Sequence, residues 1–195
     1  MTRVPSLVRS VVVTTPPTDE PIELADAKLH LKVEVDDDDS LIQLQITAAR
    51  QHIETECELA LMPQKWTEYR STFPPVIELR GGVVQSIVAV KYVDSSGDTQ
   101  TLDESAYQAD LTTRPATIRP AFGQSWPACR PQPASVSVEY SAGYQDADAV
   151  PGALKAALLL VLGDLYANRS GQAGTQIFQN ATVDLLLRPW RRVLP

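Results

Sequence analysis

The chain contains few of the residues on which metal, disulfide and nucleophilic sites depend. Its 195 residues include two cysteines, Cys57 and Cys129, and two histidines, His30 and His52. Neither cysteine lies in a CxxC motif, so neither a zinc site nor a disulfide scaffold is expected. Nucleophilic catalysis usually needs a histidine base. His30 falls in a short predicted helix and His52 lies off the apolar stripe of a longer one, so both are expected to face solvent or an interface.

Sequence motifs of nucleotide-binding enzymes and hydrolases are also absent. There is no Walker A sequence, no GxGxxG and no GxSxG. The longest apolar run, residues 156–163, is far shorter than the roughly 18 residues of a membrane span. The apolar run near the N-terminus covers only residues 11–13, so no signal peptide is predicted. We therefore expect no enzyme activity, no catalytic residue, no cofactor, no metal ligand and no membrane partner.

The charge balance is acidic, with a net charge of -7, while 44% of the residues are hydrophobic. That hydrophobic content allows a core of domain size to be buried. Proteins that wrap nucleic acid usually present a basic face, so specific nucleic-acid binding is not expected. An acidic wall repels a phosphate backbone instead, which would let DNA pass nearby without adhering.

Four consecutive aspartates, residues 36–39, directly precede an apolar repeat. A calcium-binding EF-hand loop needs a glycine at its sixth position and a glutamate at its twelfth. Counted from Asp36, those positions are Leu41 and Thr47, and no later start fits. The aspartates are instead expected to accept hydrogen bonds from free backbone N–H groups at a helix start, near the positive end of its dipole.

Hydrophobic periodicity predicts helices at both ends of the chain and strands between them. Residues 21–31 and roughly 38–61 are predicted helices, the second ended by Pro63. Residues 64–145 alternate polar and apolar side chains, with a hairpin over 86–102 and a proline-rich stretch, 114–133, expected to be loop and edge. A further helix starts near Pro151, and a short one is closed by Pro189. The stripe of the long helix comprises Ile42, Ile46, Ala49, Ile53, Cys57 and Ala60.

These patterns predict an α+β fold, in which N- and C-terminal helices form an α-helical bundle with an inserted antiparallel β-rich domain. Residues 1–19 are an N-terminal extension, 20–63 plus 150–195 the helical body, and 64–149 the inserted β-rich region. The helix after Pro151 is apolar nearly all round, so it must be covered on more than one side. The long amphipathic helix is its natural cover.

Two tryptophans lie in candidate partner interfaces. The tail "RPWRR" contains Arg188, Trp190, Arg191 and Arg192, a cluster suited to phosphates or to an acidic partner surface. The alternative is that these arginines complement the negative end of the last helix. Trp126, in "GQSWP", either packs its loop on the sheet or contacts a partner.

The order of segments resembles the tailed-phage head–tail connector (adaptor, or head completion) family. The resemblance starts with "PIELADAKLHLKVEVDDDDSLIQLQITAARQHIETECELAL" and continues through "GQSWP", "VSVEYSAGY" and "VPGALKAALLLVLGDLYANR" to "LLLRPWRRV". It covers about residues 20–192. Each segment is weak alone, but their order and spacing are specific. The chain departs from the family at "ECELAL", where a "TGRAL"-like sequence is usual.

The resemblance implies a structural protein of a virion, assembled in the bacterial host cytoplasm. Family members look like homo-oligomer rings of about twelve copies that dock beneath the portal protein, and a ring requires heterologous contacts. Such a ring extends the channel for DNA ejection and receives a tail-side connector or stopper protein. Assembly can wait until the portal is present. The helical part is expected to form the ring, the C-terminal tail to reach the portal, and the strand region to lie outside or tailward.

Two other functions remain alternatives. A carbohydrate- or receptor-binding module could use Trp126 and Tyr107 as stacking platforms in a concave groove. It would leave the two helical ends unexplained. A hydrolase of unfamiliar type would need carboxylates with perturbed pKa values in a cleft. Binding to a portal separates the connector from both alternatives.

Overall fold

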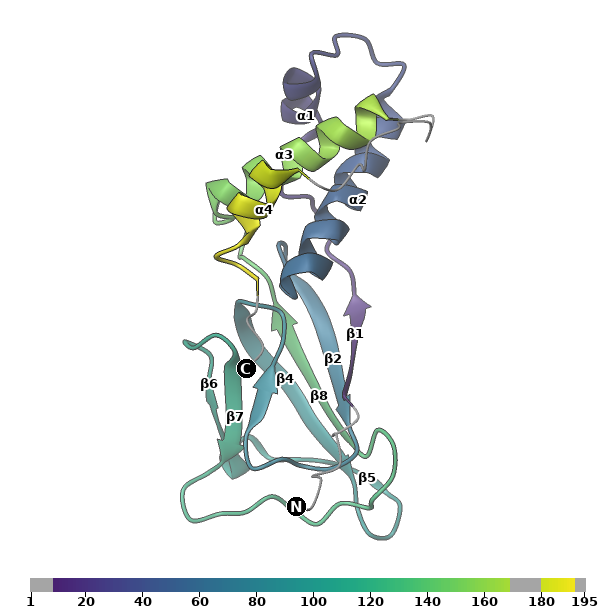
Figure 1. Cartoon of the computed structure of the whole chain (residues 1–195). Coiled ribbons are helices and arrows are strands. Elements are labelled where there is room, and N and C mark those ends of the chain that lie inside the picture. The colour runs from purple at the N-terminus through teal and green to yellow at the C-terminus, as the bar shows by residue number, and fades with distance from the viewer. Residues whose placement is uncertain (1–8, 169–179, 192–195) are drawn as a thin grey trace, which may run out of the picture. The chain divides into compact units, whose positions relative to one another are not determined.

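The computed structural model describes residues 9–168 and 180–191 of the chain (Figure 1). The chain forms two compact units, each built from separate segments. The strand unit combines Met1–Pro16 with Pro63–Gly143, and the helical unit combines Pro17–Met62 with Tyr144–Pro195. Helices and antiparallel sheets occur together, so the predicted α+β class is confirmed.

The helical unit contains α1 (Leu24–Leu31), α2 (Asp39–Cys57), α3 (Gly152–Ala167) and α4 (Ala181–Leu187). The predicted extension of the long helix to residue 61 is wrong. Glu58 adopts a left-handed backbone conformation, with φ of 51°, and ends α2 at Cys57. The chain therefore turns before Pro63 forces it to.

One buried cluster joins all four helices. Every residue of the predicted stripe is buried, including Ala60, which lies beyond the end of α2. Helix α3 contacts α1, α2 and α4, which cover its broad apolar surface. Ala27 of α1 and Val183 and Leu187 of α4 complete the cluster. The residues that α2 and α3 contribute are Ile42, Ile46, Ala49, Ile53, Cys57, Leu154, Ala157, Leu158, Val161 and Leu162. Segments from the two ends of the chain thus share one core.

The strand unit contains two antiparallel sheets. The five-stranded sheet has the order β1-β2-β8-β4-β5, and the three-stranded sheet has the order β3-β7-β6. The strands are β1 (Arg9–Thr15), β2 (Gln64–Arg70), β3 (Ile77–Leu79), β4 (Val84–Val93), β5 (Thr99–Thr101), β6 (Tyr107–Asp110), β7 (Ala116–Pro120) and β8 (Val136–Ala142), with a short 3-10 turn, Glu104–Ala106, before β6. The predicted hairpin is present as β4 and β5.

Strand β8 lies at the centre of the larger sheet and has the predicted alternation. Val136, Val138 and Tyr140 are fully buried, and the residues between them are half-buried. The Tyr140 ring lies 6.5 Å from that of Trp66 on β2, measured between centroids. The backbone of Gly81 passes so close that a Cβ there would lie 2.8 Å from the Cβ of Ala142.

The proline-rich stretch, residues 114–133, lies mostly in loops, as predicted, but it contains one strand, β7, that is not at an edge. Within it, β7 is the middle strand of the three-stranded sheet. Its prolines lie at the ends, since Pro115 precedes the strand and Pro120 is its last residue. The residues between them keep their N–H groups, so the ladder with β3 and β6 can form on both sides.

Candidate partner interfaces

The C-terminal cluster divides into packed and exposed parts. Asn180 caps α4 by accepting a hydrogen bond from the Thr182 N–H at 3.0 Å. Val183 and Leu187 are buried in the helical core, and Trp190 packs partly buried against it. Arg188 is exposed, and Arg192 lies outside the described residues. Trp190 is therefore a packing residue as much as a surface one.

Arg191 is held within the helical unit by two carboxylates. Its Nη2 lies 2.8 Å from Glu56 Oε1 and 2.6 Å from Asp184 Oδ1. The hydrogen bond to Asp184, helped by the charge of Glu56, raises the pKa of the guanidinium. This pairing agrees with the alternative in which basic residues serve the last helix, and it leaves Arg188 as the accessible arginine of the described tail.

The outer face of α4, defined here as Ala181, Leu185 and Arg188, combines apolar and basic character. These residues recur at helical spacing and all three are exposed, Leu185 with 68% of its surface accessible. An exposed leucine beside an exposed arginine suits a partner surface with an apolar pocket and acidic rim. Of the residues predicted for the tail interface, Arg188 lies on this exposed face, and Ala181 and Leu185 were not predicted.

Trp126 packs its loop onto the strand unit. Its ring stacks on Phe73 with a centroid distance of 4.7 Å and an interplanar angle of 10°. Its Nε1 donates a hydrogen bond to the Pro74 carbonyl at 2.7 Å. The Phe73 ring also contacts Tyr92, at 5.9 Å between centroids. With one ring face occupied in this way, Trp126 has less surface to offer as a stacking platform for a sugar.

The loop that contains Trp126 also carries an exposed aromatic residue, Phe122, which was not predicted from the sequence as a candidate interface residue. Phe122 is 98% exposed on the turn closed by the Gln124 N–H to Ala121 carbonyl hydrogen bond. Gly123 occupies the position of this turn that has positive φ. The sequence signal for this exposed position is the aromatic residue directly before a turn glycine, because that order indicates a side chain at the tip of a loop.

The acidic run joins helices rather than capping one. The N-cap residue of α2, Asp38, makes no side-chain capping bond, so the predicted bonds to free backbone N–H groups are absent there. Asp38 instead accepts a hydrogen bond from the Tyr166 hydroxyl of α3 at 2.7 Å. Asp36 and Asp39 each lie 2.6 Å from Lys28 Nζ of α1. The physical reason is that cationic and hydroxyl partners on neighbouring helices are within reach of these carboxylates.

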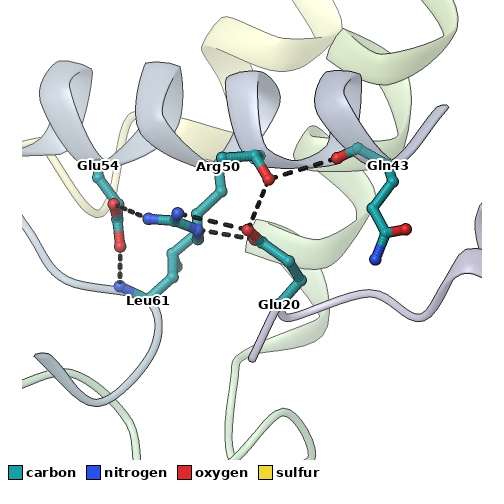
Figure 2. A network of polar contacts seen from close by, with 6 residues as sticks. Glu20, Gln43, Arg50, Glu54 and Leu61 are labelled. Atoms are coloured by element: carbon teal, nitrogen blue, oxygen red, sulfur yellow. Dashed lines mark hydrogen bonds and ion pairs between the residues drawn. The ribbon is translucent and has the colours of Figure 1, made fainter. Parts of the chain in front are cut away.

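A buried ion network fixes the segment before α1 to α2 (Figure 2). Arg50 is 4% exposed, and its Nε lies 2.7 Å from Glu20 Oε2 while its Nη1 lies 2.7 Å from Glu54 Oε2. Glu20 also accepts from the Thr47 hydroxyl at 2.8 Å, and Glu54 from the Leu61 N–H at 2.8 Å. Every charge in the network has several partners, as a buried ion pair requires.

Electrostatics favour the charged form of Arg50 in this network. Burial acts to lower the pKa of the Arg50 guanidinium, but the hydrogen bond to Glu20 and the charges of Glu54 and Glu20 outweigh burial and raise that pKa. The network therefore binds three chain segments together. Sequence patterns missed it because Glu20 and Arg50 are far apart along the chain.

The described residues hold no arrangement suited to metal binding, and the buried cysteine is poorly reactive. Among residues 9–168 and 180–191, no group of three or more His, Cys, Asp or Glu side chains could hold a metal ion. Burial raises the pKa of the Cys57 thiol to about 11, so it is protonated at neutral pH and weakly nucleophilic. None of the helices in the described part of the chain has the length and apolar character to cross a membrane.

Comparison with known proteins places the chain among components of phage-like particles. Residues 21–120 match the family model described as Phage gp6-like head-tail connector protein. No curated protein matches the chain. Three solved structures share its fold. A chain of the "Neck of empty GTA particle computed with C6 symmetry" is 21% identical, with a TM-score of 0.77, over 95% of this chain and 97% of that one.

The other two comparisons extend over similar lengths. A chain of the "Virion of native gene transfer agent (GTA) particle" is 20% identical with a TM-score of 0.77, over 94% of this chain and 97% of that chain. A chain of the "Neck of native GTA particle computed with C12 symmetry" is 23% identical with a TM-score of 0.73, over 96% and 97%. At these identities the likeness establishes a shared fold.

Proposed function

The chain belongs to the Phage gp6-like head-tail connector protein family, and from this premise we propose that it is the ring-forming adaptor of a tailed phage, a prophage or a related particle. It is a structural virion protein and not an enzyme. In the proposed role, about twelve copies form a ring beneath the portal protein, as a closed heterologous assembly allows. The ring extends the DNA channel and receives the tail-side connector or stopper.

The observation that carries this proposal is the similarity of the whole fold to neck components. The shared fold covers 95% of this chain and 97% of a chain from a neck determined with C6 symmetry, so neither unit is an unrelated addition. A neck determined with C12 symmetry contains a chain of the same fold. The acidic balance, a net charge of -7, suits a wall past which DNA moves without specific binding.

We assign part of the ring contacts to the helical unit and the portal contact to the outer face of α4. Leu29 on α1 is 79% exposed and Leu44 on α2 is 67% exposed, which is unusual for large apolar side chains unless a partner covers them. Leu185 and Arg188 supply an apolar anchor and an accessible cation on α4. Assembly would take place in the host cytoplasm, with the strand unit on the outer or tail-facing side of the ring.

Native mass spectrometry of the purified chain, alone and with its candidate portal, tests the proposal. The expected result is a complex in which the copies of this chain match the portal's subunits in number. Arg188→Glu should weaken portal binding about tenfold or more, because a cation at the interface becomes a like charge to an acidic partner. Arg119→Glu, an equal charge change at an exposed position on β7, is the matched control and should bind normally. A strict monomer that ignores the portal and binds glycans would overturn the proposal.

A further inference from the structure

Strand β1 is an open sheet edge of a kind that soluble proteins usually protect. It pairs with β2 on one side only and ends the five-stranded sheet (Figure 1). No described residue pairs with its other side. Ser10 to Thr15 contain no charged residue and no proline, and Val12 and Val13 are 46% and 47% exposed. Charges, prolines, bulges and covering loops are the usual protections of an edge. Here only Thr14 interrupts the regular register, which runs over residues 9–13.

The opposite edge of the same sheet is also partly uncovered. Strand β5 pairs only with Lys91, Tyr92 and Val93 of β4. The Leu102 N–H donates to the Val90 carbonyl, which extends this cover by one residue. Residues 84–89 of β4 therefore pair with β8 on one side and with no described strand on the other. Gln85, Ser86 and Val88 are exposed along this stretch, Val88 to 44%.

We propose that residues 9–13 of β1 pair with residues 84–89 of β4 in the next copy of this chain, so that the five-stranded sheets continue from subunit to subunit. The choice of a second copy of this chain as the partner of the open edge rests on the ring proposed above. A ring needs two different complementary surfaces on each subunit, and the two edges of one sheet supply them. Strand addition at an open edge satisfies backbone N–H and C=O groups and covers the exposed valines.

Strand direction supports this pairing. β1, β2, β8 and β4 are each antiparallel to the next, so β1 and β4 run in opposite directions within one copy. Rotation about a ring axis keeps the direction of every strand relative to that axis. The β1 strand of one copy therefore meets β4 of the next copy antiparallel, whereas it would meet β5 parallel. Antiparallel pairs are slightly more stable per residue.

Self-pairing of either edge fits less well. Two β1 strands paired with each other would give a two-fold contact, which closes after two copies. Two β4 edges paired with each other would also give a two-fold contact that closes after two copies. The pairing of β1 with β4 uses one β1 edge in each contact. Each added copy then still has one unpaired sheet edge to which the next copy can bind.

Cysteine cross-linking tests the pairing directly. In a Cys129→Ser background, Val12→Cys would be combined with Ser86→Cys or with Val88→Cys, which together sample neighbouring registers. Mild oxidation, on the chain alone at rising concentration and on the portal complex, should give a ladder of covalent species beyond the dimer. Each single-cysteine variant should give no ladder. A Val12→Cys variant that alone forms dimers as efficiently as the double variants would overturn the proposal in favour of symmetric β1 pairing.

Lysine substitutions at the edge give a second, non-covalent test. Val12→Lys with Val13→Lys should lower self-association about tenfold or more, because lysines on an edge strand oppose strand addition. Val35→Lys with Val76→Lys adds the same charge at exposed valines on neither edge and should assemble normally. Circular dichroism and thermal unfolding of the isolated chains should show that both variants fold.

The outcomes separate this inference from the adaptor role. A ring that is seen by native mass spectrometry, but gives no cross-linked ladder and is unaffected by the β1 lysines, would refute the sheet contact and leave the adaptor role standing. A chain that neither binds the portal nor forms a ladder would refute both.

Discussion

The helical and strand units keep their shapes by different means. The helical unit depends on side chains that repeat along helices and meet in one aliphatic cluster, with the Arg50 network as its main buried polar element. The strand unit depends more on backbone geometry, because all five glycines with positive φ among the described residues lie in it, between Gly81 and Gly143. Side-chain deletions should therefore be most damaging in the first unit, and backbone constraints in the second.

The largest expected effect is from Arg50→Met in the helical unit. This change leaves the carboxylates of Glu20 and Glu54 without their shared cation. Removing one partner of a buried ion pair typically costs 3–5 kcal/mol, and we expect about 3 kcal/mol because Glu20 keeps some contact with water. Urea unfolding would measure the loss. Hydrogen exchange should rise more in peptides of α2 and α3 than in those of β2 and β8.

Arg188→Met is the matched control for this comparison. It removes an exposed arginine from the same unit and should change stability by no more than about 0.5 kcal/mol. If Arg50→Met were equally mild, or if it raised exchange in both units alike, the network would not be a local support of the helical unit and the contrast between the units would fail.

In the strand unit, among substitutions that add one methyl group, Gly81→Ala should lower the free energy of unfolding most. Gly81 has φ of 101°, and the new Cβ would lie 2.8 Å from the Cβ of Ala142. The left-handed conformation costs about 1–2 kcal/mol for alanine, and the clash adds to it, so we expect about 2–3 kcal/mol in thermal unfolding.

Gly123→Ala isolates the conformational part of that cost. Gly123 also has positive φ, 76°, but nothing lies within 4 Å of its virtual Cβ. A loss of about 1 kcal/mol is expected from conformation alone. Equal losses at the two glycines would show that the close approach to Ala142 relaxes without cost.

Trp126→Phe should have a smaller effect, since it keeps an aromatic ring on Phe73 and removes only the hydrogen bond to the Pro74 carbonyl. We expect a loss of about 1 kcal/mol in urea unfolding. Trp126→Ala would remove the stack as well and should cost about 3 kcal/mol. Portal binding that fell sharply for Trp126→Phe with stability unchanged would instead mark Trp126 as a contact residue.

Sequence periodicity predicted those elements whose signal repeats over several turns or residue pairs. The stripe Ile42 to Cys57 repeats over most of α2, and β8 alternates along its whole length, so both were found. β1 was missed because its three consecutive valines do not alternate and its partner β2 lies far along the chain. β7 was missed because the proline rule was applied to the whole segment, although its prolines lie at the strand ends.

The candidate interfaces were predicted from residue type alone. How much of each interface is accessible depends on the contacts that its residues make within the folded chain. The cluster at the C-terminus was identified from its arginines and tryptophan. Arg191 pairs with Glu56 of α2 and with Asp184 of α4, and no local sequence pattern contains the contact with Glu56. The same holds for the aspartates before α2, whose partners lie on α1 and α3. Local charge identifies a surface of interest, and tertiary packing determines which groups remain available.

The smallest effect should come from Asp36→Asn, and its pH dependence carries the information. The hydrogen bond from Lys28 lowers the pKa of the Asp36 carboxyl below its ordinary value of 3.8. A carboxyl with a lowered pKa in the folded state contributes stability above its unfolded pKa and loses it as pH falls through the folded pKa. The wild type should therefore be slightly more stable than Asp36→Asn at neutral pH, and the difference should disappear in acid. Asp37→Asn, at the next exposed position, is the control. If it reproduced the same pH-dependent loss, general charge in the acidic run, and not the link from α1 to the start of α2, would be the source of the effect.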